Sequence, residues 1–294
     1  MNVLLAGASG YIGSGVLSAL LSSGHSVTAL VRSEEKAAAV RRGGVLPVVA
    51  DMRARDVVRQ LAAQADAVIT TASPGDETSA AAEIDFAEAV LAGLRRGSAF
   101  VRTGGIWVYG AGEDITEGSP IKAPDIVAWR PEIDAGLLAA SQVRSLLVEP
   151  GIVYGHGKGI PNVVMSAEAT GGDFPALRLI GPGTQHWSTV HVGDLAELYV
   201  AALEQGETGS RFIGVSGINP TVREMGEAAS WRRGLEGRVV AEDGASTFER
   251  LGAFGEALLL DQQATGNAAR EILGWNPTRP SLLEVITGGG YDQT

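Results

Sequence analysis

Cysteine is absent from this sequence of 294 residues, which excludes disulfides, thiolate catalysis and cysteine metal sites. Apolar runs near the ~20 residues of a membrane-spanning helix are also missing. No basic segment opens the chain, so we expect no signal peptide. Basic residues are few, and a formal net charge of −11 argues against nucleic acid and anionic membranes as partners. We therefore expect a cytoplasmic protein with a small-molecule ligand.

Glycine, in contrast, is placed at regular intervals near the start of the chain. A short apolar run, Val3 to Ala6, is typical of a buried strand. Gly7, Gly10 and Gly13 follow it three residues apart, and an apolar helical pattern continues to Gly24. A dinucleotide pyrophosphate needs this order, because glycine lets the backbone approach the phosphates and the helix N-terminus offers free N–H groups. We therefore predict a dinucleotide site here.

Apolar runs and helical segments alternate through the first half of the chain, which predicts a doubly wound parallel Rossmann sheet. In the second half, glycine-rich loops broken by short apolar pieces indicate a smaller C-terminal α/β substrate lobe. We assign residues 1–155, plus about 188–202, to the dinucleotide-binding domain and the remainder of 156–294 to the lobe. The strands are predicted at Val3–Ala6, Ser26–Val31, Val45–Ala50, Asp66–Thr71, Ala99–Arg102 and Arg144–Glu149.

Three local details can be predicted within this sheet. Pro47 suggests a bulge or an irregular hydrogen-bond ladder in the third strand. A long helix is expected over residues 78–96, with Ile84 and Leu94 on its apolar face. A further helix is expected to begin near Pro131, since proline is favoured in a first turn.

The residues after the second strand bear on the choice of cofactor. Dinucleotide sites that take NAD usually carry an acidic residue there to bind the ribose 2′-hydroxyl. This chain reads Val31-Arg32-Ser33, without a carboxylate, and Arg32 with Ser33 could hold a 2′-phosphate. The alternative is that Arg32 is a solvated surface charge and Ser33 only the N-cap of the next helix. We expect NADP rather than NAD.

Several motifs along the chain point to one family. They are Gly-Ala-Ser-Gly-Tyr-Ile-Gly at 7–13, Val-Tyr-Gly at 108–110, Pro-Gly-Ile-Val-Tyr-Gly at 150–155, Val-His-Val-Gly-Asp-Leu-Ala at 190–196 and Leu-Gly-Trp-Asn-Pro at 273–277. Together they resemble the extended and atypical short-chain dehydrogenase/reductases, which include the sugar-nucleotide epimerases and dehydratases. The resemblance covers nearly the whole chain.

The same resemblance breaks at the residues that usually carry the chemistry. The family reads Ser-Ser before its Val-Tyr-Gly motif, and this chain has Gly104-Gly105, with Thr103 as the nearest hydroxyl. The family's Tyr-x-x-x-Lys pair is missing altogether, and the matching positions are Trp129 and Ile133. Glu149 also stands where arginine is usual. The chain has kept the cofactor cradle and lost the usual proton donor.

The motif positions give a set of candidate cofactor residues. The resemblance implies that Asp51 and Met52 lie against the adenine, that residues 71–73 pass the ribose and phosphates, and that residues 150–153 pass the nicotinamide. The full set is Gly7, Ser9, Gly10, Tyr11, Ile12, Gly13, Arg32, Ser33, Asp51, Met52, Thr71, Ala72, Ser73, Thr103, Gly104, Pro150, Gly151, Ile152 and Val153.

A reaction on this fold needs a proton source, and few side chains qualify. Tyr109, expected at the carboxyl edge of the sheet, and His186, in a lobe loop, are the candidate acids, and Thr103 could orient a carbonyl. Tyr109 could instead be a pocket wall. His25 and His191 are expected to be structural, and no metal site is expected. Glu132 and Asp134 could be acids if turned inward, or first-turn carboxylates that favour a helix dipole, and we favour the second interpretation.

These observations favour one function and leave others open. We expect an atypical NADP-dependent oxidoreductase that acts on a small, largely apolar substrate, because Trp107, Trp129 and Trp187 suggest an aromatic pocket. One alternative is a redox-neutral isomerase, cyclase or lyase on the same fold. Another is a non-catalytic NADP-binding sensor. The oligomeric state, monomer or homodimer, stays open.

Overall fold

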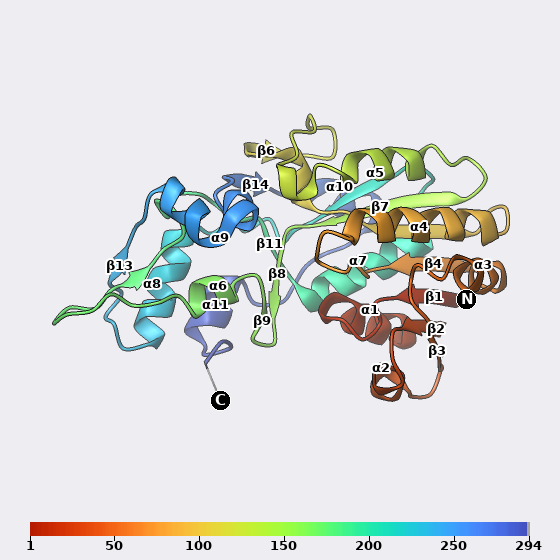
Figure 1. The fold of residues 1–294 in the computed structure, drawn as a ribbon, viewed down its shortest axis with the longest axis horizontal. Helices are drawn as coiled ribbons and strands as arrows, with labels where there is room; N and C mark the ends of the chain where they lie inside the picture. The colour runs from red at the N-terminus through yellow and green to blue at the C-terminus, as the bar shows by residue number, and fades with distance from the viewer. Residues whose placement is uncertain (293–294) are drawn as a thin grey trace.

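A computed structural model describes residues 1–292, and a parallel sheet lies at the centre of its N-terminal half (Figure 1). Within these residues the sheet has seven strands in the order β12-β7-β5-β4-β1-β2-β3. Its strands are β1 (Asn2–Ala6), β2 (Ser26–Val31), β3 (Val45–Val49), β4 (Ala67–Thr70), β5 (Ala99–Thr103), β7 (Arg144–Pro150) and β12 (Arg211–Gly214). The order runs outward in both directions from β1, so the predicted doubly wound sheet is confirmed.

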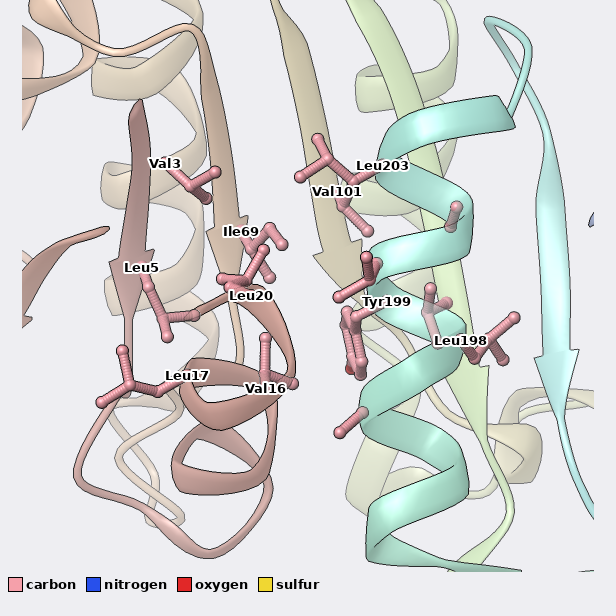
Figure 2. Packing of buried hydrophobic residues seen from close by; sticks show 14 of the residues in the cluster. Val3, Leu5, Val16, Leu17, Leu20, Ile69, Val101, Leu198, Tyr199 and Leu203 are labelled. Carbon is pink, nitrogen blue, oxygen red and sulfur yellow. The ribbon is translucent and has the colours of Figure 1, made fainter. Parts of the chain in front are cut away.

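One face of the sheet is covered by α1 (Tyr11–Ser22), α2 (Glu34–Val40) and α7 (Val192–Gln205). Leu17 and Leu20 of α1 and Leu198 of α7 all belong to the apolar core between these helices and the sheet (Figure 2). Each is at least 98% buried, and burying a leucine side chain is worth about 1.5–3 kcal/mol. This core therefore fixes the helix that follows the glycine turn against the sheet.

The opposite face carries α3 (Arg55–Gln64), α4 (Ser79–Gly93) and α5 (Arg130–Leu138). The predicted apolar face of α4 is confirmed in part: Leu94, just beyond the end of the helix, is 9% exposed, but Ile84 is 42% exposed. Phe86 is buried instead, and so is Glu83, whose carboxylate accepts a hydrogen bond from Arg102 on β5.

The predicted irregularity at Pro47 was also wrong. β3 is the edge strand, and Pro47 pairs with Ala29 of β2 in an unshifted register. Proline lacks an N–H, and an edge strand has one side on which no ladder hydrogen bond is needed. The edge therefore accepts Pro47 without a bulge.

A second lobe lies beside the sheet (Figure 1). Its own apolar core includes Trp187, Met225 and Leu258. The predicted return at 188–202 falls on β11 and α7, and β12 then joins the main sheet. Within residues 1–292, none of the helices has both the length and the apolar character to cross a membrane. The remaining elements are η1 (Ile106–Tyr109), β6 (Gly112–Ile115), η2 (Asp125–Val127), β8 (Ile152–Gly155), β9 (Lys158–Gly159), α6 (Asn162–Met165), β10 (Leu177–Arg178), β11 (Thr189–His191), α8 (Val222–Arg232), β13 (Val239–Val240), α9 (Gly244–Leu258), β14 (Gln262–Ala264), α10 (Asn267–Leu273) and α11 (Leu282–Thr287).

Candidate functional site

The turn between β1 and α1 is shaped by glycines that cannot be replaced without a clash. Gly7 has a φ of 90°, which side-chain-bearing residues rarely adopt, and its carbonyl accepts a hydrogen bond from the Gly10 N–H at 2.8 Å. A Cβ on Gly13 would lie 1.9 Å from the Gly7 oxygen. Since α1 begins at Tyr11 without a side-chain cap, its first N–H groups can face a phosphate. The residues present fit a dinucleotide pyrophosphate.

Thr71 connects this turn to the end of β4. Its hydroxyl donates to the Ala6 carbonyl at 3.1 Å, and a Cβ on Gly7 would lie 2.7 Å from the same hydroxyl. Ser9, Tyr11 and Ile12 of the turn are each partly exposed. Ala72 and Ser73 follow Thr71 along the same edge of the sheet.

Arg32 and Ser33, the residues predicted to bind the 2′-phosphate, lie just after the end of β2. Arg32 is exposed, and Ser33 is the N-cap of α2, its hydroxyl accepting from the Lys36 N–H at 3.3 Å. The pKa of Asp76 is lowered, first by hydrogen bonds from Thr78 and further by the positive charge of Arg32. Arg32 therefore lies near the loop that follows β4.

The predicted adenine residues lie beyond the end of β3. Asp51 is exposed, and its carboxylate accepts a hydrogen bond from the Arg53 N–H at 2.8 Å. Met52 is 8% exposed and belongs to the apolar core under α3 and α4. Asp51 is thus the more accessible of the two residues.

At the end of β5, the hydroxyl of Thr103 already makes hydrogen bonds with two other groups of the protein. It donates to the Thr70 carbonyl at 2.6 Å, so Tyr199 of α7 must donate to the Thr103 oxygen. Tyr199 is fully buried beneath the sheet, so this hydroxyl points away from the open edge. A role for Thr103 in orienting a carbonyl would require these bonds to rearrange.

The two glycines that follow Thr103 differ in their surroundings. A Cβ on Gly104 would lie 2.9 Å from Cγ of Glu149, whereas among the described residues no atom comes within 4 Å of a Cβ on Gly105. Glu149 thus fills the space beside Gly104, while the space beside Gly105 is open. Gly105 has an extended backbone, with a φ of 171°, that any residue can adopt.

Tyr109 lies behind these glycines in a buried charged group. Its hydroxyl donates to the Glu149 carboxylate at 2.7 Å, and Arg211 of β12 binds the same carboxylate at 2.7 Å. Burial, followed by the negative charge of Glu149, raises the pKa of Tyr109 well above its ordinary value. Tyr109 is 2% exposed, which gives it the surroundings of a structural hydrogen-bond donor.

His186 has a different environment, with an acidic partner that sequence reasoning missed. Asp261 accepts hydrogen bonds from the His186 backbone N–H at 2.8 Å and from its Nδ1 at 2.9 Å. The His186 side chain is 32% exposed. Asp261 precedes β14, lies 75 residues from His186 and carries no local motif, so no sequence signal pointed to the contact.

The turn after β7 is enclosed on both sides. A Cβ on Gly151 would lie 2.3 Å from the Ser188 carbonyl, and the same carbonyl accepts from the Ile152 N–H at 2.7 Å. Pro150 and Val153 are buried next to it. Residues 150–153 are therefore fixed between β12 and β11, and their backbone has little freedom.

The first turn of α5 brings a cation to the end of β5. Arg130 donates to the carbonyls of Thr103 and Gly104, both at 3.2 Å, and its guanidinium stacks 4.7 Å from the centre of the Trp129 ring. Ile133, one turn further on, packs into the core under α4. Trp129 and Ile133, the positions that match the missing Tyr and Lys, thus hold apolar side chains.

The other three histidines make contacts within the fold. His25 is buried and contacts Glu204 of α7 at 3.0 Å. His191 is the N-cap of α7, and its Nδ1 accepts from the Gly193 N–H at 3.1 Å. The ring of His156 packs against His191. The prediction that His25 and His191 are structural agrees with these contacts.

A groove of about 1040 Å³ runs along the outer side of α1 and α7, from Ser9 and Tyr11 toward Glu204. Most of its lining belongs to the helices rather than to the carboxyl ends of the strands. Ligands of open α/β sheets bind outside those carboxyl ends. We therefore place the candidate site at the strand ends and not in this groove.

The fold and the glycine turn define a dinucleotide-binding α/β protein, and comparison with known proteins is more specific. A family model described as NAD(P)H-binding matches residues 7–118. A protein of Schizosaccharomyces pombe is 30% identical, covering 99% of this chain and 100% of the relative, and a 3-diazoavenalumate denitrifying reductase of Streptomyces is 30% identical over 97% and 99%. The chain belongs to the extended short-chain dehydrogenase/reductase family.

Solved structures agree in fold. A dTDP-glucose 4,6-dehydratase of Bacillus anthracis in complex with NAD has a TM-score of 0.78 at 14% identity, covering 99% of this chain and 95% of that one. A UDP-glucose 4-epimerase of Thermotoga maritima has a TM-score of 0.74 at 17% identity, over 99% and 98%. At these identities the likeness concerns the fold alone.

Proposed function

We propose that this protein is an NADP-dependent reductase that transfers a hydride to a small, largely apolar acceptor without the usual Tyr/Lys relay. The observation that carries the proposal is the glycine turn, in which a Cβ on Gly13 would collide with the Gly7 carbonyl at 1.9 Å. That geometry keeps the backbone free for a pyrophosphate. Two relatives are named as reductases, the Streptomyces enzyme and a farnesyl-dihydroquinoline-oxide ketoreductase of Stigmatella aurantiaca that is 27% identical.

Cofactor choice rests on Arg32. The position after β2 carries no carboxylate that would repel a 2′-phosphate, and Arg32 is exposed there. A guanidinium binds phosphate through paired, charge-assisted hydrogen bonds. NADP is therefore preferred over NAD in our proposal.

Bound NADPH would supply the hydride, and the chain must bind, orient and protect the reactants. The acceptor would lie near the aromatic side chains beyond β5, where Trp107 packs edge-on against Phe254 at 6.0 Å and Trp129 begins α5. Aromatic side chains contribute large apolar contact areas, which suits an apolar acceptor better than a sugar diphosphate.

The proton that balances the hydride is assigned to His186. Tyr109 donates to a buried carboxylate and has a raised pKa, so it is a poor acid. His186 bonds Asp261 through Nδ1, which leaves Nε2 to exchange a proton with the substrate or with water. Asp261 would fix the ring tautomer, as a positioning residue.

The direct test follows absorbance of the reduced nicotinamide while NADPH is mixed with aromatic ketones and quinones. A net, enzyme-dependent loss of absorbance supports the proposal. Turnover of an acceptor without absorbance change would indicate a redox-neutral enzyme. Tight NADPH binding without turnover of any acceptor would indicate a sensor.

Substitutions then locate the proton source. His186→Ala should slow turnover about 10²–10⁴-fold with cofactor affinity preserved, whereas Tyr109→Phe should cost less than about tenfold. If neither variant loses as much as about tenfold, the proton comes from water or substrate and the assignment to His186 is wrong.

A further inference from the structure

Arg130 is a cation at the carboxyl end of β5 that the proposed reaction has not yet used. Its Nη1 donates to the Thr103 and Gly104 carbonyls, which fixes the guanidinium directly over the strand end. The Trp129 ring covers one face of it at 4.7 Å. The side chain is thus held in one orientation, with little conformational entropy left to lose on binding a ligand.

Some hydrogen-bond donors of Arg130 have no partner among the described residues. Its Nη2 contacts the Glu83 carboxylate at a long 3.4 Å. Guanidinium carries five N–H donors, and two are used by the carbonyls and one by Glu83. Among the described residues, Nε and the second Nη2 hydrogen therefore have no hydrogen-bond partner.

Arg130 also balances the charge of a buried group beneath it. Glu83 and Asp134 both bind Arg102, which is 1% exposed, so two carboxylates face one buried guanidinium and Arg130 balances the second negative charge through Glu83. The Arg130 side chain is 16% exposed and is the outermost member of the group.

The sheet order places Arg130 opposite Arg32. The glycine turn follows β1, and β2 and β3 lie on one side of it while β4 and β5 lie on the other. A dinucleotide whose pyrophosphate is at this turn extends one nucleoside to each side. With the 2′-phosphate at Arg32, the nicotinamide nucleoside must extend toward β5 and Arg130.

We propose that Arg130 binds the nicotinamide nucleoside, donating hydrogen bonds to its ribose or carboxamide oxygens and so positioning the ring. This inference rests on the proposed NADP dependence. It assigns Arg130 to one half of the cofactor, and that assignment can be tested with a ligand that lacks this half.

The test is calorimetric titration of wild type, Arg130→Gln and Arg130→Lys with NADPH and with 2′,5′-ADP, which carries the 2′-phosphate but no nicotinamide nucleoside. Arg130→Gln should weaken NADPH about 10- to 100-fold and 2′,5′-ADP less than about twofold, as expected for loss of charged hydrogen bonds to one half. Arg130→Lys, which keeps the charge, should show a smaller loss of NADPH alone, about two- to tenfold. Arg32→Ala is the matched control and should weaken both ligands.

Equal losses for the two ligands would mean that Arg130 only supports the end of β5. Unchanged NADPH affinity in both variants would overturn the proposal directly. If Arg130→Gln does not fold, the selectivity of Arg130→Lys decides the matter in the same way. A wild-type protein that binds neither ligand would instead refute the proposed NADP dependence.

Discussion

At the scale of single residues, the adjacent Gly104 and Gly105 differ in the space around them. The Glu149 side chain occupies the space beside Gly104, and Tyr109 and Arg211 hold that carboxylate in place. The space beside Gly105 is open among the described residues. The family serine is thus sterically excluded at one position and merely missing at the other.

Replacing each of these two glycines by serine tests the difference between them. Gly104→Ser should lower the free energy of unfolding by about 1–3 kcal/mol, because Glu149 must move and give up its partners. Gly105→Ser should change it by less than about 1 kcal/mol, since nothing is displaced. Urea-induced unfolding of both variants measures the difference, and equal losses would show that Glu149 does not fill the Gly104 space.

Single residues also show where sequence reasoning succeeds. The roles of Gly7 and Gly13 follow from covalent geometry, so a strand followed by spaced glycines predicts them without tertiary information. The partners of Tyr109 and His186 do not follow, because Glu149 and Asp261 lie 40 and 75 residues away from them in the sequence. A side chain's proton affinity depends on such partners.

At the scale of elements, α5 is anchored by a buried ion pair. Asp134 was interpreted as a first-turn carboxylate serving the helix dipole, and that was wrong, since it is fully buried and binds Arg102 of β5. Burial lowers the pKa of Arg102, and the Glu83 carboxylate opposes that shift. Periodicity alone could not show this, because both faces of so short a helix carry polar residues.

Removing Asp134 should therefore be costly. Asp134→Ala should lower the free energy of unfolding by about 3–5 kcal/mol, because it leaves the Arg102 charge buried with a single carboxylate. Glu132→Ala, on the exposed side of the same turn, should change it by no more than about 0.5 kcal/mol. Urea denaturation compares the two, and a small effect of Asp134→Ala would mean that the ion pair does not anchor α5.

The N-terminus of α7 should make stability depend on pH. Burial, with smaller contributions from Arg279 and His156, lowers the pKa of His191 below its unfolded value of 6.5, although Asp194 opposes the shift. The unfolded chain therefore binds a proton at His191 at higher pH than the folded chain does. Stability is complete above pH 6.5 and is lost as the pH falls through the folded pKa.

His191→Asn isolates this contribution, since asparagine can also cap a helix but does not titrate. Urea unfolding between pH 7.5 and 5.5 should show a shallower loss of stability on acidification in the variant than in the wild type. Parallel curves would mean that His191 is not the titrating group.

At the scale of the whole molecule, sequence pattern predicted the doubly wound sheet because its strands and helices are local and strongly patterned. The contribution of β12 to that sheet was not foreseen. Its four residues carry no distinctive pattern and follow a segment that already resembled a return to the first domain. The position of a short strand in a sheet depends on the strand with which it pairs, and the sequence alone does not identify that strand.

The central claim is that the strand ends of this sheet bind NADPH through the glycine turn and Arg32. Calorimetric titration of the wild-type chain with NADPH and with NADH tests it most directly. We predict that NADPH binds more tightly, and that Arg32→Ala removes the preference by weakening NADPH about 10- to 100-fold while leaving NADH nearly unchanged. Tighter binding of NADH by the wild type would contradict the account.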